Sequence, residues 1–358
     1  MAKTNLVRLT ASAGRSTLLV SVLAGLLTVS ALLVTACGGG DDETRAAQSA
    51  STSSGVKLYT ASTADDPNRY LVYYPLLHGL VKNPKVKLDM KLLPFATAAE
   101  AFQTKQYDLV EANFINVAQG AQKGFKTEII SFALQDKASA AIVVKKGSDI
   151  KSPADLKGKK VGIQVLQTIF GLQARSVLET NYGLDTSPEG GDIKWVEIPE
   201  IPTLYRLLEK GDVSAIVTSQ LATWQTVGKP DGPTTLLMNA AQEFNKAQNT
   251  EAVLGTLWLT YPGTVPEKDI SALRALFKAN TDYLYAHEDE LVAKVAQERD
   301  VDPAYLKWFL QSVSLGSGPI TPAQKTALKA DLGAAADLKI VEPVADPDAL
   351  IAAPADGQ

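Results

Sequence analysis

The sequence has few of the residues from which metal and redox centres are built. It contains one cysteine and two histidines in 358 residues. A single cysteine excludes an internal disulfide framework, a four-cysteine zinc site and an iron–sulfur cluster, and two histidines leave little for a histidine-rich metal centre. We therefore expect no cofactor and no metal.

The chain also lacks an excess of basic residues. It has 35 lysines and arginines against 39 aspartates and glutamates, a formal net charge of −4. Such a balance does not favour a nucleic-acid partner, because binding to a phosphate backbone depends on clustered positive charge. Catalytic GxSxG and HExxH patterns and a phosphate-binding glycine loop are also missing from the sequence.

What the sequence does have is enough apolar material for a large core. Apolar residues make up 46% of the chain and charged residues 21%. This composition excludes disorder as the main state, and the length predicts about two domains.

The N-terminus carries the pattern of an exported protein. Lys3, Arg8 and Arg15 precede an apolar run over 18–34, which ends in Thr-Ala-Cys at Cys37. A positive lead, an apolar segment and small residues before a cysteine are typical of a bacterial lipoprotein signal peptide. The sequence thus predicts a signal peptide over 1–36 and a lipid on Cys37 that anchors the chain in a membrane. An uncleaved signal anchor or a free buried cysteine is the alternative.

The segment after the predicted cleavage site reads as a tether. Removal of 1–36 takes away three basic residues and no acidic one, which leaves 32 basic and 39 acidic residues, a side-chain balance of −7. Residues 37–55 then hold the lipidated cysteine and, over 38–54, three glycines, a short acidic group and a Ser/Thr/Ala stretch without apolar periodicity. This composition is typical of a flexible linker.

From residue 56 onward, short β-branched runs alternate with amphipathic stretches. This alternation is expected when parallel strands are connected by covering helices, so the sequence predicts an α/β fold. Strands are expected at 56–60, 87–93, 108–112, 126–132, 140–144, 160–164, 193–198 and 213–218. Helices are expected at 68–80, 97–106, 116–123, 168–182, 202–210, 220–227, 267–299 (bent or interrupted), 303–312 and 321–332.

One segment carries a family resemblance. The stretch IKSPADLKGKKVGI at 150–163 resembles the solute-binding proteins of ABC importers, in the branch that binds sulfonates, taurine, nitrate and pyrimidine precursors. Two shorter phrases, KQYDLV at 105–110 and EKGDVSAI at 209–216, are similar to phrases of the same family. In the second of them, Ser214 stands where the family usually has aspartate.

The resemblance implies a two-lobed periplasmic-binding-protein type II fold with a helical C-terminal portion. Lobe one is expected at 56–138 and 253–345, lobe two at 139–252, and a tail at 346–358. The chain would cross between the lobes twice, at hinges near 137–140 and within 239–252. The resemblance also implies a monomer that encloses a small organic ligand and passes it to an ABC permease and its ATPase.

Candidate ligand-binding residues follow from the rule that open α/β sheets bind ligands at the carboxyl ends of strands, near helix N-termini. They are Ser62, Thr63, Arg69 and Tyr70 after the first strand, Asn113 and Phe114 after the third, Ser139 at the hinge, Gln164, Gln167 and Thr168 in the 164–171 loop, and Thr218, Ser219 and Gln220 after the 213–218 strand.

The chemistry of these residues points to a ligand class. Arg69 can present a planar fork to a carboxylate or sulfonate, and Tyr70 can stack on a flat ligand. Relatives commonly carry Gly-Ser in the 164–171 loop, whereas this chain has bulkier residues at 165–168. This departure disfavours nitrate and favours a sulfonate, an aromatic carboxylate or a pyrimidine-like molecule.

Some of these residues have a plain structural reading as well. Asn116, Thr168 and Ser219 can simply cap helices. Tyr73 and Trp224 can be core residues.

Two other functions stay open at this point. An anchored receptor that signals to a sensor protein would use the same closure around a ligand. Pyrimidine-precursor synthases resemble these binders, but they rely on a cysteine-rich segment and histidine chemistry. His78 and His287 have no serine, cysteine or paired acid at a telling spacing. We therefore expect a binding protein rather than an enzyme.

Overall fold

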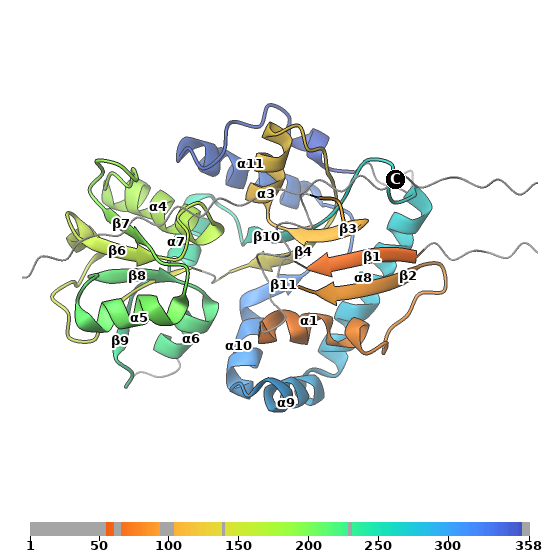
Figure 1. Ribbon diagram of the computed structural model, residues 1–358, viewed down its shortest axis with the longest axis horizontal. Helices are drawn as coiled ribbons and strands as arrows, with labels where there is room; N and C mark the ends of the chain where they lie inside the picture. Colours follow the sequence, from red (N-terminus) through yellow and green to blue (C-terminus); the bar gives the residue numbers. More distant parts are fainter. Residues whose placement is uncertain (1–54, 61–65, 94–103, 138–139, 228–230, 353–358) are drawn as a thin grey trace, which may run out of the picture. The chain divides into compact units, whose positions relative to one another are not determined.

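The computed structural model describes residues 55–60, 66–93, 104–137, 140–227 and 231–352, which belong to one compact unit of the chain (Figure 1). They form two β-sheets with helices packed on them. The predicted α/β class is therefore confirmed.

The first sheet has six strands in the order β11-β4-β10-β3-β1-β2. The strands are β1 Gly55–Thr60, β2 Lys87–Leu92, β3 Leu109–Ala112, β4 Glu128–Asp136, β10 Val253–Thr260 and β11 Val313–Leu315. β1 pairs in parallel with β2 and β3, whereas β10 and β11 run antiparallel to their neighbours. The sheet is thus mixed, where the sequence predicts parallel strands.

The second sheet has five strands in the order β7-β6-β8-β5-β9. The strands are β5 Ala141–Lys145, β6 Lys160–Ile163, β7 Lys194–Glu197, β8 Ala215–Thr218 and β9 Thr234–Met238. β6 is parallel to β7 and β8, and β5 is antiparallel to β8 and β9. All strands of this sheet lie between β4 and β10 in the sequence.

The faces of the six-stranded sheet are covered by different helices, as Figure 1 shows. These helices are α1 Pro67–Leu77, α3 Phe114–Gln122, α8 Glu267–Ala286, α9 Glu288–Arg299, α10 Pro303–Ser312 and α11 Pro322–Asp337. Successive side chains of a strand point to opposite faces. Ile130 and Trp258 therefore pack with α1, α8, α9 and α10, while Ile129 and Leu257 pack with α3 and α11.

The five-stranded sheet shows the same division. Its helical elements are the 3-10 helix η1 Pro153–Leu156, α4 Ile169–Tyr182, α5 Ile201–Lys210, α6 Gln220–Val227 and α7 Ala240–Ala247. Val143 and Ile216 pack under α5, whereas Ile142 and Val217 face the core that holds α4 and α7. Strand alternation thus buries both faces of each sheet.

Two helix boundaries differ from the prediction for identifiable reasons. α1 ends at Leu77 instead of residue 80, because Gly79 adopts a left-handed φ of +64° and the Leu80 N–H donates to the Pro75 carbonyl (2.8 Å). α3 starts at Phe114 instead of residue 116. Asn113 caps it, and its side chain accepts from the Asn116 N–H (2.9 Å), so the predicted cap at Asn116 is wrong.

Other elements confirm or correct the prediction more simply. The long 267–299 stretch is interrupted at His287, as expected. α7, β9, β10 and β11 are not among the predicted elements. Residues 104–106 are not helical, and most of the predicted helix at 97–106 lies outside the described residues.

Residues near the C-terminus pair with the six-stranded sheet. The 3-10 helix η2 Pro347–Leu350 precedes Ile351, which forms a β-bridge with Ile129 and thereby attaches residues of the predicted tail to β4. In the part of the chain that the structure describes, no helix is both long and apolar enough to span a bilayer. The predicted signal peptide and Cys37 lie outside that part.

Candidate ligand-binding site

Both sheets contain a point at which the chain connections diverge. In the six-stranded sheet, β1 leads through α1 to β2 on one side, and its parallel neighbour β3 leads through α3 to β4 on the other. In the five-stranded sheet, β6 leads through α4 to β7, and its parallel neighbour β8 leads through α6 to β9. Ligands of open α/β sheets bind at such crossover points, outside the carboxyl ends of the strands. The four loops that follow these strands form the candidate site.

The turn into α1 presents two polar side chains. Asp66 caps the helix and accepts from the Asn68 N–H (2.9 Å), and Pro67 at the first helical position supplies a fixed φ. Burial raises the pKa of the Asp66 carboxyl above its ordinary value of 3.8, an effect that the Arg69 charge opposes. Asn68 and Arg69 follow directly and point to different partners.

Arg69 forms a buried ion pair with a glutamate of β3. Its Nη1 lies 3.0 Å from Oε1 of Glu111, which is fully buried, and the Arg69 side chain itself is 13% exposed. The hydroxyls of Tyr73 and Thr256 also donate to Glu111, at 2.7 and 2.6 Å. A buried carboxylate needs such partners. The charge of Arg69 is therefore already balanced by Glu111, which the sequence does not single out.

The environment of Glu111 also affects Tyr73. Burial, followed by the Glu111 charge, raises the pKa of the Tyr73 phenol well above its usual range. The phenol therefore stays protonated and keeps donating to Glu111. This places Tyr73 among the structural residues rather than in contact with a ligand.

Asn68 joins a group of aromatic side chains. Its Nδ2 donates to the Tyr305 hydroxyl of α10 (2.6 Å), and its Oδ1 is buried without a hydrogen-bond partner among the described residues. The Trp224 ring of α6 lies 6.5 Å from the ring of Tyr305 and 5.8 Å from that of Trp308. A free amide acceptor thus lies close to three aromatic rings, two of which are only half-buried.

This aromatic group is not among the residues that the sequence predicts for the site. Trp224 has the spacing of a core residue, and the α10 aromatics belong to a stretch expected only to cover the first lobe. The group forms because α6, which follows β8, packs against α10. A contact between helices so far apart in the sequence leaves no local signal.

The loop after β6 is held by its own hydrogen bonds. Gln164 Nε2 donates to the Pro199 carbonyl (2.9 Å), and the Leu166 N–H donates to the Glu197 carboxylate (2.5 Å). Thr168 caps α4, accepting from the Gly171 N–H (3.4 Å) and donating to the Val165 carbonyl (2.9 Å). The capping interpretation of Thr168 is therefore correct, and Gln167 is exposed.

Gly171 is required for this loop to approach α4. A Cβ atom at this position would lie 1.9 Å from the Leu166 carbonyl oxygen. A separation below 3.0 Å is not tolerated by real side chains, and the clashing atom belongs to the backbone. The glycine thus permits the close packing of the 164–168 loop over the first turn of the helix.

The loop after β8 presents hydroxyl groups. Thr218 is buried and Tyr205 is half-buried, and their two hydroxyls are neighbours. Burial raises the pKa of Tyr205, and the neighbouring Thr218 hydroxyl opposes this shift. The Ser219 carbonyl accepts from the N–H and the hydroxyl of Thr223, and Gln220 begins α6.

The remaining candidates occupy different environments. Asn113 uses its side chain as the α3 cap, and Phe114 is fully buried in the core. Tyr70 donates to Glu298 of α9 (2.9 Å), so it does not join its neighbour Arg69. Three candidates lie outside the described residues, namely Ser62, Thr63 and Ser139.

The structure therefore groups the candidates by sheet. The parallel pair β1 and β3 brings Arg69 and Asn113 to the same edge, and the pair β6 and β8 does so for Thr168 and Thr218. Across the described residues, no cluster of three or more histidine, cysteine, aspartate or glutamate side chains is arranged to hold a metal ion. The site offers hydrogen-bonding groups and aromatic rings.

Solved structures share this fold. The periplasmic aliphatic sulphonate-binding protein SsuA from Escherichia coli has a TM-score of 0.65 and 16% identity, covering 84% of this chain and 92% of that one. The alkanesulfonate-binding protein SsuA from Xanthomonas axonopodis bound to MOPS has a TM-score of 0.59 and 17% identity, covering 80% and 94%.

Curated proteins match shorter parts of the chain. A 4,5-dihydroxyphthalate decarboxylase from Comamonas testosteroni is 32% identical over 98 residues, and the match spans 27% of this chain and 28% of that protein. A protein of the same name from Pseudomonas putida is 24% identical over 188 residues, which is 45% of this chain and 71% of that protein.

The family assignment comes from the sequence of both sheets. A family model described as "ABC transporter, phosphonate, periplasmic substrate-binding protein" matches residues 59–302. This range includes the 150–163 segment and the four loops of the candidate site. The resemblance to ABC-importer binding proteins is thereby confirmed, and the chain belongs to the phosphonate-type periplasmic substrate-binding proteins of ABC transporters.

Proposed function

We propose that this chain is a lipid-anchored receptor of an ABC importer. After removal of 1–36, lipid on Cys37 holds the body outside the cytoplasmic membrane. The body, a monomer, encloses one small organic molecule between lobe one (56–138 and 253–345) and lobe two (139–252), and delivers it to a permease and its ATPase. The observation that carries this proposal is the pair of crossover points, each with hydrogen-bonding groups at the carboxyl ends of its strands.

Among sulfonates, pyrimidine-like molecules and aromatic carboxylates, the third class fits these groups best. Trp224, Tyr305 and Trp308 offer ring faces, and Asn68 offers a free acceptor for a hydroxyl or an acid proton. The α4 N-terminus suits a carboxylate. Arg69 contributes little net charge because Glu111 balances it. The names of the two curated relatives, which refer to a dihydroxyphthalate, support the same class.

Thermal unfolding with a ligand panel tests both parts of the proposal. The probes are 4,5-dihydroxyphthalate, MOPS and a pyrimidine carboxylate. A ligand present at one hundred times its Kd stabilises the folded state by about 2.7 kcal/mol, which is well within the range of the measurement. We expect this shift with the phthalate. A larger shift with MOPS would replace the ligand class, and a folded protein that responds to no probe would overturn the binding function.

Two variants locate the bound molecule. Trp224→Leu and Asn68→Asp should each reduce the phthalate-induced shift, the first by removing a ring face and the second by placing a carboxylate beside the ligand. Tyr70→Phe is the matched control, because the Tyr70 hydroxyl donates to Glu298 and should not contact the ligand. An unchanged shift in both site variants would move the site elsewhere.

The similarity to decarboxylases gives a second candidate function, turnover of the bound molecule. We propose binding without chemistry, as in the transport family to which the chain belongs. Incubation with 4,5-dihydroxyphthalate and measurement of released CO₂ distinguishes the two functions. Release at a rate proportional to the protein concentration would make the chain an enzyme.

A further inference from the structure

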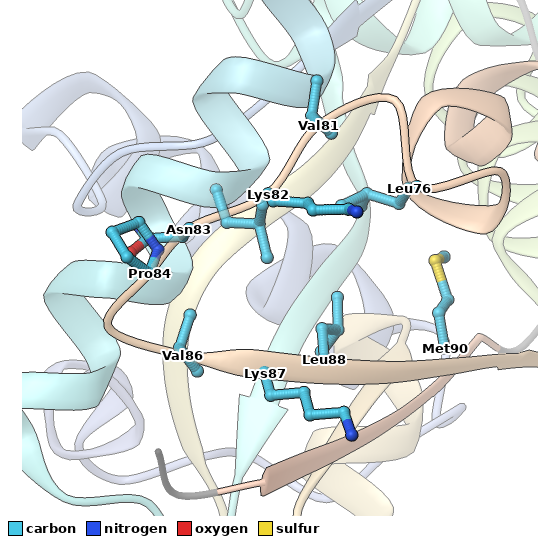
Figure 2. Close-up of a pocket in the computed structure, with 11 residues that line it drawn as sticks. Leu76, Val81, Lys82, Asn83, Pro84, Val86, Lys87, Leu88 and Met90 are labelled. Atoms are coloured by element: carbon cyan, nitrogen blue, oxygen red, sulfur yellow. The ribbon is translucent and has the colours of Figure 1, made fainter. Parts of the chain in front are cut away.

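A cavity of about 420 Å³ lies beside the edge strand of the six-stranded sheet, away from the candidate ligand site (Figure 2). It is an open pocket lined by the end of α1, the 79–86 loop, β2 and α8. Its lining residues are mostly apolar and include no carboxylate: Leu76, Gly79, Val81, Lys82, Asn83, Pro84, Val86, Lys87, Leu88, Met90 and Leu276. None of the candidate ligand-binding residues is among them.

The cavity has an apolar floor and a cationic rim. Leu88 and Met90 project into it from one face of β2, as Figure 2 shows, while the Lys87 side chain extends on the other side of the strand. Val86, just before the strand, also lines the cavity. The Lys82 side chain extends across the cavity towards Leu76 (Figure 2) and is exposed. An anionic group bound at Lys82 would therefore have an apolar recess beneath it.

The surface around this cavity is locally basic. Residues 76–88 carry Lys82, Lys85 and Lys87, all exposed, and no acidic residue. The next acidic side chain, Asp89, is paired with Lys91 at 2.9 Å. This basic stretch contrasts with the acidic body predicted for the mature chain, so its charge favours a negatively charged partner.

An exposed leucine stands next to these lysines, in a loop of fixed conformation. Leu80 is 45% exposed and follows Gly79, whose left-handed backbone ends α1. Asn83 anchors the loop, since its Nδ2 donates to the Ala272 carbonyl of α8 (3.0 Å) and its Oδ1 accepts from the Lys85 N–H (2.9 Å). The loop thus presents an apolar tip and basic side chains without further ordering.

This surface lies beside Gly55, the first residue of β1. Lys87 is the register partner of Gly55 in the parallel pair β1–β2, so the cavity adjoins the first residue of the sheet. Cys37 precedes Gly55 by 18 positions. The composition of 38–54 predicts a flexible linker, and a linker of that length would have an end-to-end distance of about 20–25 Å. A lipid on Cys37 would keep this edge of the sheet near the bilayer.

We propose that the surface formed by Leu80, Lys82, Lys85 and the β2 cavity binds an anionic phospholipid of the membrane in which the chain is anchored. The phosphate faces Lys82 and Lys85, an acyl segment enters the apolar recess, and Leu80 inserts at the interface. This inference rests on the lipid anchor of the proposed function. It assigns the body an orientation on the membrane that the tether alone does not impose.

Hydrogen exchange of the lipidated chain in nanodiscs tests the proposal. Discs of phosphatidylcholine alone are compared with discs containing 30% phosphatidylglycerol. We expect exchange of the amides of 79–88 to slow several-fold in the anionic discs, while the amides of α5 exchange equally in both. Equal exchange of 79–88 in the two kinds of disc would overturn the proposal.

Charge reversal supplies the matched variants. The double variant Lys82→Glu and Lys85→Glu should abolish the protection, whereas Lys159→Glu with Lys194→Glu, two exposed lysines at the five-stranded sheet, should preserve it. Protection that survives the first variant would contradict the assignment. Protection of 79–88 by a free alkyl carboxylate in solution, without any effect of anionic discs, would make the cavity a small-molecule site instead.

Failure of phospholipid binding can be distinguished from failure of the proposed anchoring and ligand binding. A chain without lipid on Cys37 would fail to enter the discs, which identifies a failure of the anchor. Lys82→Glu with Lys85→Glu should leave the phthalate-induced thermal shift unchanged, because the cavity shares no residue with the candidate ligand site.

Discussion

The two crossover points differ in how their polar groups are partnered. At β1/β3, the charges of Arg69 and Glu111 satisfy each other, and the hydroxyls of Tyr73 and Thr256 complete the network. At β6/β8, the Glu197 carboxylate accepts from the Leu166 backbone, and the hydroxyls of Thr218 and Tyr205 neighbour each other without a charged partner. The polar groups at the first crossover point therefore already bind one another. The second keeps hydrogen-bonding capacity that a ligand can use.

Removing Glu111 from the ion pair should have the largest effect on the free energy of unfolding. Glu111→Ala leaves the Arg69 guanidinium buried and unpaired, and losing one partner of a buried ion pair costs about 3–5 kcal/mol. Urea unfolding measures this loss. The nearly isosteric Glu111→Gln should cost less, because its amide oxygen can still accept one of the two hydrogen bonds that Tyr73 and Thr256 donate to different oxygens of Glu111. A loss of unfolding free energy below about 1 kcal/mol for Glu111→Ala would show that this ion pair does not stabilise the β1/β3 crossover point.

A second buried carboxyl, that of Asp331, should make the stability of the protein depend on pH. Asp331 of α11 is fully buried, accepts from the Leu254 N–H at 3.2 Å, and has its pKa raised by burial to about 7. Between its ordinary 3.8 and about 7, the folded state holds more protons than the unfolded state, so stability falls as pH rises through this window.

Asp331→Asn removes this dependence while keeping an acceptor for Leu254. The variant should gain stability over the native chain, and the gain should be about 2–3 kcal/mol larger at pH 8 than at pH 5. Denaturant midpoints at the two pH values measure it. A gain that does not change with pH would mean that Asp331 titrates normally.

At the β6/β8 crossover point, the packing of the 164–168 loop on α4 can be tested at Gly171. Gly171→Ala places a methyl group against the Leu166 carbonyl and should cost about 1–3 kcal/mol as the loop moves away. The control is Gly333→Ala in α11, where a Cβ would meet nothing within 4 Å. That change should stabilise the helix by about 0.5–1 kcal/mol. Equal effects of the two changes on thermal unfolding would contradict the close approach.

The smallest expected effect on stability comes from Thr218→Val. The hydroxyl is uncharged and neighbours that of half-buried Tyr205, so its loss should change the free energy of unfolding by less than about 1 kcal/mol. The ligand-induced thermal shift should nevertheless decrease if the ligand uses this hydroxyl. A variant that is strongly destabilised without ligand would show that Thr218 is structural, like Glu111.

The sequence predicts the α/β class and most strands and helices, because strand alternation and capping residues are local signals. Thr168 at the start of α4 and the interruption within 267–299 are examples. The mixed pairing of β10 and the α6–α10 contact are not predictable in the same way, since each joins segments that are distant in the chain.

The candidate site is predictable to the level of loops rather than of side chains. The strand-end rule identifies the loops after β1, β3, β6 and β8, but the role of each residue depends on its partners. Phe114 is in the core and Asn113 is a cap, whereas Glu111 and Asn68 hold central positions. A charged residue inside an otherwise apolar strand, as at Glu111, is the signal by which the sequence could have revealed the ion pair.

The place of β10 has a consequence for how the chain acquires its structure. This strand lies between β3 and β4, yet it is synthesised only after all of residues 137–252. The six-stranded sheet therefore has a gap until the other sheet has emerged from the ribosome, and such long-range pairing slows folding. The first half of the chain therefore cannot complete its own sheet until residues 253–260 have been made.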